Sequence, residues 1–192
     1  RENEVGISKT IHSLVPTILA GILEKCGDSH AIDQVFNPLR NFDPAILDKL
    51  SSLLEDENRA HHDPKDASGQ LLSVIFGAKI PAITHAVASF SGVKPSTVAS
   101  LLGLATPLTM GLLSKKISAE GLNPSTLVRD LLRQRDTILS LLPAGVGSLL
   151  GMANADQGNG FRDGKTSGGA GWVWLLLLLL ALGGGLFFWL KS

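Results

Sequence analysis

Residues 172–190 read WVWLLLLLLALGGGLFFWL, a run without a single charged side chain. A helix needs about 20 apolar residues to cross the hydrocarbon core of a bilayer, and this run has nearly that length. All three tryptophans of the chain lie here, and the order Trp172, Trp174 and Trp189 puts them at both ends, where amphipathic rings settle at membrane interfaces. Lys191 follows directly and extends toward the headgroups. The sequence therefore predicts one membrane anchor at 172–190.

The rest of the chain divides into two parts by composition. Residues 1–151 predict one helical domain, and residues 152–171, rich in Gly, Asn, Asp and Ser, predict a flexible linker. Up to Leu142 the chain has 14 Lys and Arg against 15 Asp and Glu, so the domain is nearly neutral and does not favour nucleic acid as a partner. The single cysteine, Cys26, excludes an internal disulfide and fits a reducing compartment.

Apolar residues at intervals of three and four predict that the domain is all-α, without an alternating strand pattern. Prolines inside the apolar patterns, Pro16, Pro81 and Pro107, predict bent helices. We expect Asn37-Pro38 to end the second helix near Phe36. The predicted helices cover residues 5–25, 29–36, 44–54, 67–91, 95–116 and 124–142, the fourth bent near Gly77 and Pro81.

The two longest helical patterns resemble each other. Each follows a short glycine turn, contains an internal proline (Pro16 or Pro107) and ends in basic residues. The prolines lie at different distances from the glycines, so aligning the two patterns requires a gap. A duplicated helical hairpin and a chance likeness between two leucine-rich helices both remain open.

Several segments resemble a known family. SGVKPSTVASLLGLATPLTMGLLSKKI (91–117), GLNPSTLVRDLL (121–132) and SLLPAGVGSLLG (140–151) are similar, in order and spacing, to the bacterial family catalogued as domain of unknown function 937. HSLVPTILAGIL (12–23) resembles its N-terminal half, so the likeness covers about 5–151. The resemblance implies a compact helical domain without assigned activity or catalytic residues. Some members of the family continue through a Gly-rich linker and one membrane span into an OmpA-like domain. We would expect contact with peptidoglycan only through such a domain.

Few residues suggest chemistry. His61-His62-Asp63 has metal-ligand side chains, but a structural zinc site needs four ligands, so a solvated loop is the simpler interpretation. Asp156 to Gly160 faintly resembles a calcium loop but lacks the downstream glutamate. Cys26 precedes His30 by four residues, and a half-buried structural cysteine is favoured over a Cys–His nucleophile. We therefore expect no catalytic residue, no metal and no cofactor.

Two functional hypotheses follow from these patterns. The first is a membrane-anchored interaction or scaffold module of the bacterial cell envelope that acts by self-association or partner docking. The alternative is an apolar small-molecule or lipid-binding domain, with a pocket near Pro16, Pro81 and Pro107. The expected partners are membrane lipid and either further copies of the chain or an envelope-protein complex. Arg162 and Lys165 before the anchor favour a single-pass inner-membrane protein with a cytoplasmic domain.

Overall fold

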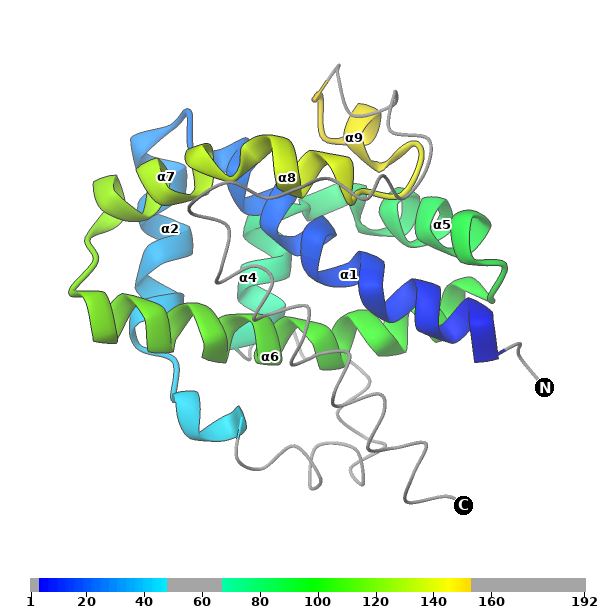
Figure 1. Ribbon diagram of the computed structural model, residues 1–192, viewed down its shortest axis with the longest axis horizontal. Helices are drawn as coiled ribbons and strands as arrows, with labels where there is room; N and C mark the ends of the chain where they lie inside the picture. The colour runs from blue at the N-terminus through cyan, green and yellow to red at the C-terminus, as the bar shows by residue number, and fades with distance from the viewer. Residues whose placement is uncertain (1–3, 48–66, 153–192) are drawn as a thin grey trace.

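The computed structural model describes residues 4–47 and 67–152, and all regular secondary structure in these two ranges is helical (Figure 1). The all-α class is therefore confirmed for this part of the chain. The predicted anchor at 172–190, the linker beyond Met152 and the predicted histidine cluster at 61–63 lie outside the described residues. The elements, in chain order, are α1 (Glu4–Lys25), α2 (Ser29–Arg40), η1 (Pro44–Leu47), α4 (Ala67–Ile75), η3 (Gly77–Lys79), α5 (Ile80–Ser91), α6 (Pro95–Glu120), α7 (Pro124–Arg133), α8 (Arg135–Ser140) and α9 (Val146–Leu149).

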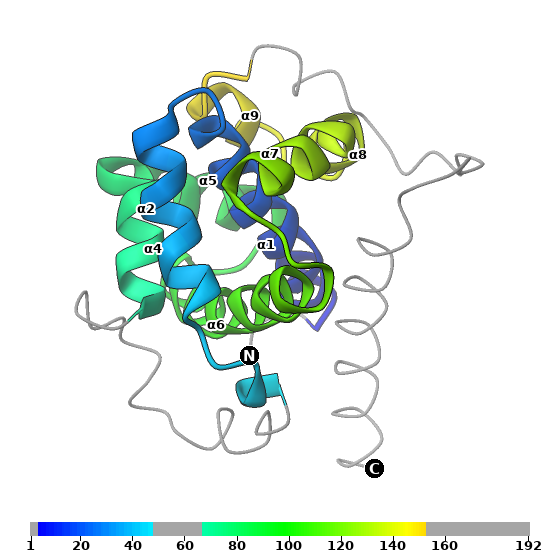
Figure 2. The ribbon, with the colours of Figure 1, turned by 90° about the vertical axis from the view of Figure 1, so that its left-hand side faces the viewer.

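The central element is α1, which follows the predicted helix almost residue for residue. Every residue from Ser13 to Leu23 is buried, because α1 packs against α2, α4, α5, α6, α7 and α8. Figure 2 shows these helices arranged around it. Its hydroxyls bond within the helix: Thr17 Oγ1 donates to the Ser13 carbonyl over 2.7 Å. A helix enclosed in this way needs an apolar surface on all sides, which its sequence provides.

The second long helix, α6, lies along one side of the domain and packs against α1, α2, α4, α5 and η1 (Figure 1). It continues through Pro107 and ends at Gly121, whose φ of 60° is the left-handed conformation that favours glycine. We predicted an end near Lys116, but the helix runs one turn further because Ser118 to Glu120 contain no residue that stops a helix. Both long helices therefore accept an internal proline.

A proline also lies inside α2, contrary to the predicted end at Phe36. Pro38 lacks an N–H and so forfeits one helical hydrogen bond, but it lies in the last turn, where this loss is small. The fully buried Leu39 and a hydrogen bond from the Asn41 N–H to the Asn37 carbonyl hold that turn in the helix. Packing outweighs the proline signal here.

The predicted bend between residues 67 and 91 is present and sharp. The helix axes before and after Phe76 differ by 92°, and Gly77 takes the positive φ that the turn requires. Pro81 is exposed and lies in the first turn of α5, where a missing N–H costs nothing. The chain therefore turns before Pro81.

Candidate interaction surface

Helix α6 contains the longest uncharged run within the described residues. Lys94 is its N-cap, with extended backbone, and Pro95 takes the first helical position, which proline favours. The next charged residue is Lys115, so the 20 residues from 95 to 114 contain no Lys, Arg, Asp or Glu. At 1.5 Å per residue this run is about 30 Å long.

One face of α6 belongs to the core. Its largest buried side chains are Leu102, Met110 and Leu113, each at most 2% exposed. Two of its buried hydroxyls bond within the helix: Thr106 Oγ1 donates to the Leu102 carbonyl and Thr109 Oγ1 to the Ala105 carbonyl, both over 2.7 Å. Burial of this face therefore leaves these two hydroxyls without need of a partner from another helix.

The opposite face carries half-buried leucines, which we call the leucine stripe: Leu101, Leu104, Leu108 and Leu112. They follow one another at intervals of three and four residues and so lie in a row along the helix. Leu101 packs against the core, whereas the other three are not part of the core cluster that the described residues form. A surface helix of a soluble domain usually presents polar side chains at such positions, so this row is a candidate binding surface.

Lysines flank the stripe at both ends. Continuing the same spacing leads back through Thr97 to Lys94 and forward to Lys115, and both lysines are exposed. The whole row spans about 32 Å along the helix at 1.5 Å per residue. The face is therefore apolar in its middle and positive at its two ends.

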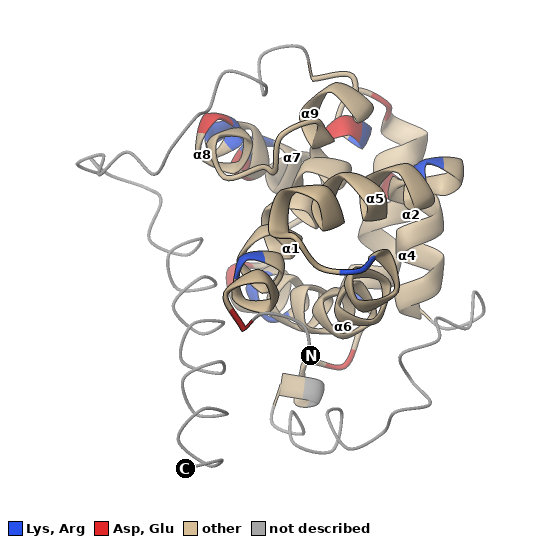
Figure 3. Cartoon of the chain, turned by 90° about the vertical axis from the view of Figure 1, so that its right-hand side faces the viewer, with Lys and Arg blue, Asp and Glu red and all other residues tan. Residues whose placement is uncertain are grey.

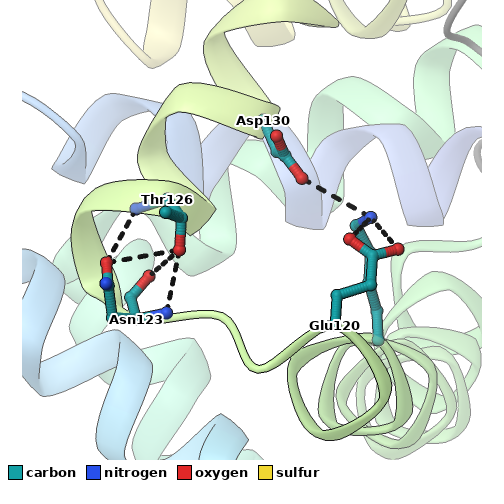
Figure 4. A network of polar contacts seen from close by, with 5 residues as sticks. Glu120, Asn123, Thr126 and Asp130 are labelled. Carbon is teal, nitrogen blue, oxygen red and sulfur yellow. Dashed lines mark hydrogen bonds and ion pairs between the residues drawn. The ribbon is translucent and has the colours of Figure 1, made fainter.

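The neighbouring lysine, Lys116, has a different environment (Figure 4). Its Nζ lies 2.6 Å from Glu120 Oε2 and 3.5 Å from Asp130 Oδ2, and its side chain is only 13% exposed. The ion pair with Asp130 joins α6 to α7. Of the two adjacent lysines, Lys116 thus stabilises the fold, while Lys115 remains at the surface.

The start of α7 is held by a capping box, which Figure 4 also shows. Asn123 Oδ1 accepts a hydrogen bond from the Thr126 N–H over 3.0 Å, and Thr126 Oγ1 accepts one from the Asn123 N–H over 2.8 Å. These reciprocal bonds satisfy N–H groups that a helix start leaves unpaired. They fix the first turn of α7 and thereby the position of Asp130.

The surface of α7 is polar where that of α6 is apolar. Leu127 and Leu131 are fully buried, while Arg129 and Arg133 are exposed, as their spacing predicts. Leu132 is 50% exposed, although it directly follows the buried Leu131 in the apolar pattern of this helix. It is an isolated apolar residue between arginines, and such residues are common on soluble surfaces.

The prolines that we considered as pocket-lining residues do not share one environment. Pro16 and Pro107 are buried inside α1 and α6, whereas Pro81 is exposed at the start of α5. Pro81 therefore does not face the interior with the other two. The arrangement does not favour a pocket lined by all three.

Cys26 has the environment of a structural cysteine. Burial raises the pKa of its thiol to about 11, and Sγ lies 3.5 Å from the Ile22 carbonyl within its own helix turn. The thiol is therefore protonated at neutral pH and is a poor nucleophile. Among residues 4–47 and 67–152, no three His, Cys, Asp or Glu side chains lie close enough together to hold a metal ion.

Two of the described helices, α1 and α6, are long and apolar enough to cross a membrane by length and composition. The bent pair formed by α4 with the segment from Gly77 to Ser91 also meets this criterion if it is counted as one broken span. In the domain both long helices are packed against other helices. Length and composition alone therefore do not separate a core helix from a membrane span.

The family assignment rests on residues 2–116, which match the family described as bacterial protein of unknown function (DUF937). The match covers more than half of the chain, and the chain belongs to this family. It includes α1 to α5 and most of α6, and it ends at Lys116, so segments 121–132 and 140–151 lie beyond it. No curated protein and no solved structure matches the chain. An OmpA-like continuation stays an expectation from the resemblance alone.

The leucine stripe was not identified from the sequence, because the apolar residues of 95–116 were assigned to one helix without being divided between a buried and an exposed face. The spacing of residues nevertheless indicated this row, which repeats at intervals of three and four residues: Lys94, Thr97, Leu101, Leu104 and Leu108. A row that starts at a lysine and repeats at three and four residues marks a surface face. The apolar residues on all other sides of α6 obscured it.

Proposed function

We propose that this protein is a membrane-anchored helical interaction module of the bacterial cell envelope, which acts by binding and not by catalysis. The predicted anchor at 172–190 holds it in the membrane, and the positive-inside bias favours a cytoplasmic domain on the inner membrane. The observation that carries the proposal is the leucine stripe on α6. It is a continuous apolar row, and three of its four leucines lie outside the core cluster of the described residues.

The chemistry of the described residues supports a binding role. The thiol of Cys26 is protonated at neutral pH, and the ion pairs of Glu24 with Lys79 and of Lys116 with Asp130 join structural elements. Each of these groups has a role in packing or in holding helices together. Of the leucine stripe, in contrast, Leu104, Leu108 and Leu112 are not part of the core cluster of the described residues.

A site-specific cross-link tests the proposal in the membrane. A photo-reactive amino acid replaces Leu108 in the full chain, and the matched control places it at Leu132, the exposed leucine of α7. We expect position 108 to form a discrete product with an envelope component or a second copy, and position 132 to form none. Equal labelling at both positions would contradict a docking role for α6.

A further inference from the structure

We propose that the leucine stripe of α6 docks on the anionic surface of the same bilayer that holds the predicted anchor. This inference rests on the proposed function, because it names the partner of the surface described above. It differs from membrane spanning: α6 stays in the folded domain and lies in the plane of the membrane interface. The occupant is the lipid surface, with leucines toward the acyl chains and lysines toward the headgroups.

The charges at the two ends argue for this partner. Lys94 and Lys115 are both positive, so a parallel pairing of two α6 helices would oppose like lysines, and an antiparallel pairing would place Lys94 opposite Lys115. The acidic residue nearest along the helix, Glu120, is already bonded to Lys116. A second copy therefore meets repulsion in either direction, whereas an anionic bilayer attracts both ends.

Helices α4 and α5, which pack against α6, contain no acidic residue that would weaken this attraction. From Ala67 to Ser114 the only charged residues are Lys79 and Lys94. In Figure 3, α4 and α5 are drawn without charged residues, whereas α7 and α8 carry both basic and acidic residues. The stretch from α4 to the end of the stripe therefore contains positive charges only, and Lys79 is paired with Glu24 of α1.

The size of the stripe fits a tethered lipid contact better than a protein interface. Stable protein interfaces bury about 800 Å² on each partner, more than four half-buried leucines can expose. A membrane contact that is too weak to bind by itself can persist when a second attachment, such as an anchor, already holds the protein at the bilayer. Residues 153–171 join the described domain to the predicted anchor and extend to at most about 65 Å, so the bilayer is always within reach.

A fluorescent label on the full chain tests the docking. The Cys26→Ser, Leu108→Cys variant receives a nitrobenzoxadiazole group at its new thiol and is reconstituted into phosphatidylcholine vesicles with or without about one third phosphatidylglycerol. The control is Cys26→Ser, Leu132→Cys with the same label. Far-UV circular dichroism of both variants, matched to the unmodified chain, establishes that the fold is retained.

We expect the label at 108 to be brighter on the anionic vesicles, and to be quenched by lipids that carry a shallow spin label. The label at 132 should remain in water. High salt should reduce the contact, and Lys94→Gln or Lys115→Gln should each weaken docking about fivefold. Equal signals at 108 and 132 would overturn the inference, as would strongest quenching from the bilayer centre.

The two proposals fail separately. If position 108 cross-links a protein in membranes while its label stays in water on anionic vesicles, the lipid inference is wrong and the docking function stands. If the label contacts lipid as expected, both stand. If neither experiment distinguishes 108 from 132, the docking function itself is wrong.

Discussion

Helices α1 and α6 are alike in sequence and differ in position. Both are long, both contain a proline, and both meet the length and composition of a membrane span. Yet α1 is enclosed from Ser13 to Leu23, while α6 presents a row of half-buried leucines on one side. The difference teaches that an apolar helix without a polar face is not by itself a core helix. Its neighbours decide which of its leucines lie in the core and which remain partly exposed.

The largest effect is expected from matched leucine truncations in the two helices. Leu19→Ala in α1 should lower the free energy of unfolding by about 2–5 kcal/mol, because a fully buried side chain leaves a cavity. Leu108→Ala in α6 should cost less, about 1 kcal/mol, since its side chain is only partly buried. Urea unfolding of the detergent-solubilised chain, followed by circular dichroism, measures both. Equal losses would mean that the stripe is part of the core.

The second largest effect is expected at Gly21 of α1, where the Phe76 side chain packs closely against the helix. A Cβ added at Gly21 would lie 2.5 Å from Cε1 of the Phe76 ring, which is buried at the bend after α4. Gly21→Ala should therefore cost about 1–3 kcal/mol through overpacking. Gly27→Ala is the control, because no atom lies within 4 Å of its Cβ position, and it should change stability by less than about 0.5 kcal/mol. The same unfolding measurement would contradict this account if the two variants were alike.

The smallest effect separates the adjacent lysines of α6. Lys116→Met should lower the free energy of unfolding by about 1 kcal/mol, because it removes the half-buried ion pairs with Glu120 and Asp130. Lys115→Met should leave thermal unfolding nearly unchanged, since Lys115 is exposed. The docking inference predicts the reverse ranking in the vesicle assay, where Lys115→Met should weaken docking more than Lys116→Met. A larger stability loss from Lys115→Met would show that their roles are exchanged.

Much of the fold was predictable where local signals and packing agree. The bounds of α1, the turn at Gly77, the glycine that ends α5 and the capped start of α7 all follow from apolar spacing, glycine and Asn-Pro signals. The errors occurred where packing overrides a local signal. Leu39 keeps α2 helical beyond Pro38, and Leu132 is exposed although its spacing suggested burial.

The leucine stripe was harder to predict for a physical reason. A hydrophobic period identifies a face only when a helix also has a polar face, as α7 has with Arg129 and Arg133. In α6 the run between Lys94 and Lys115 is uncharged on every side, so no charged face separates Leu108 from Leu113. Only the positions of α1, α2, α4 and α5 around α6 distinguish the buried leucine from the half-exposed one.

The sequence alone determined the all-α class of the described residues and the family, because helix spacing, caps and glycine turns are local properties. It also predicts the anchor at 172–190, from length and apolar composition. The tertiary structure decided that α1 is the enclosed helix, that Lys116 rather than Lys115 pairs with α7, and that four leucines form a row on α6. These three features depend on which segments, distant in the sequence, pack against one another. The free energy of that packing comes from contacts between segments, so no single stretch of the chain determines it.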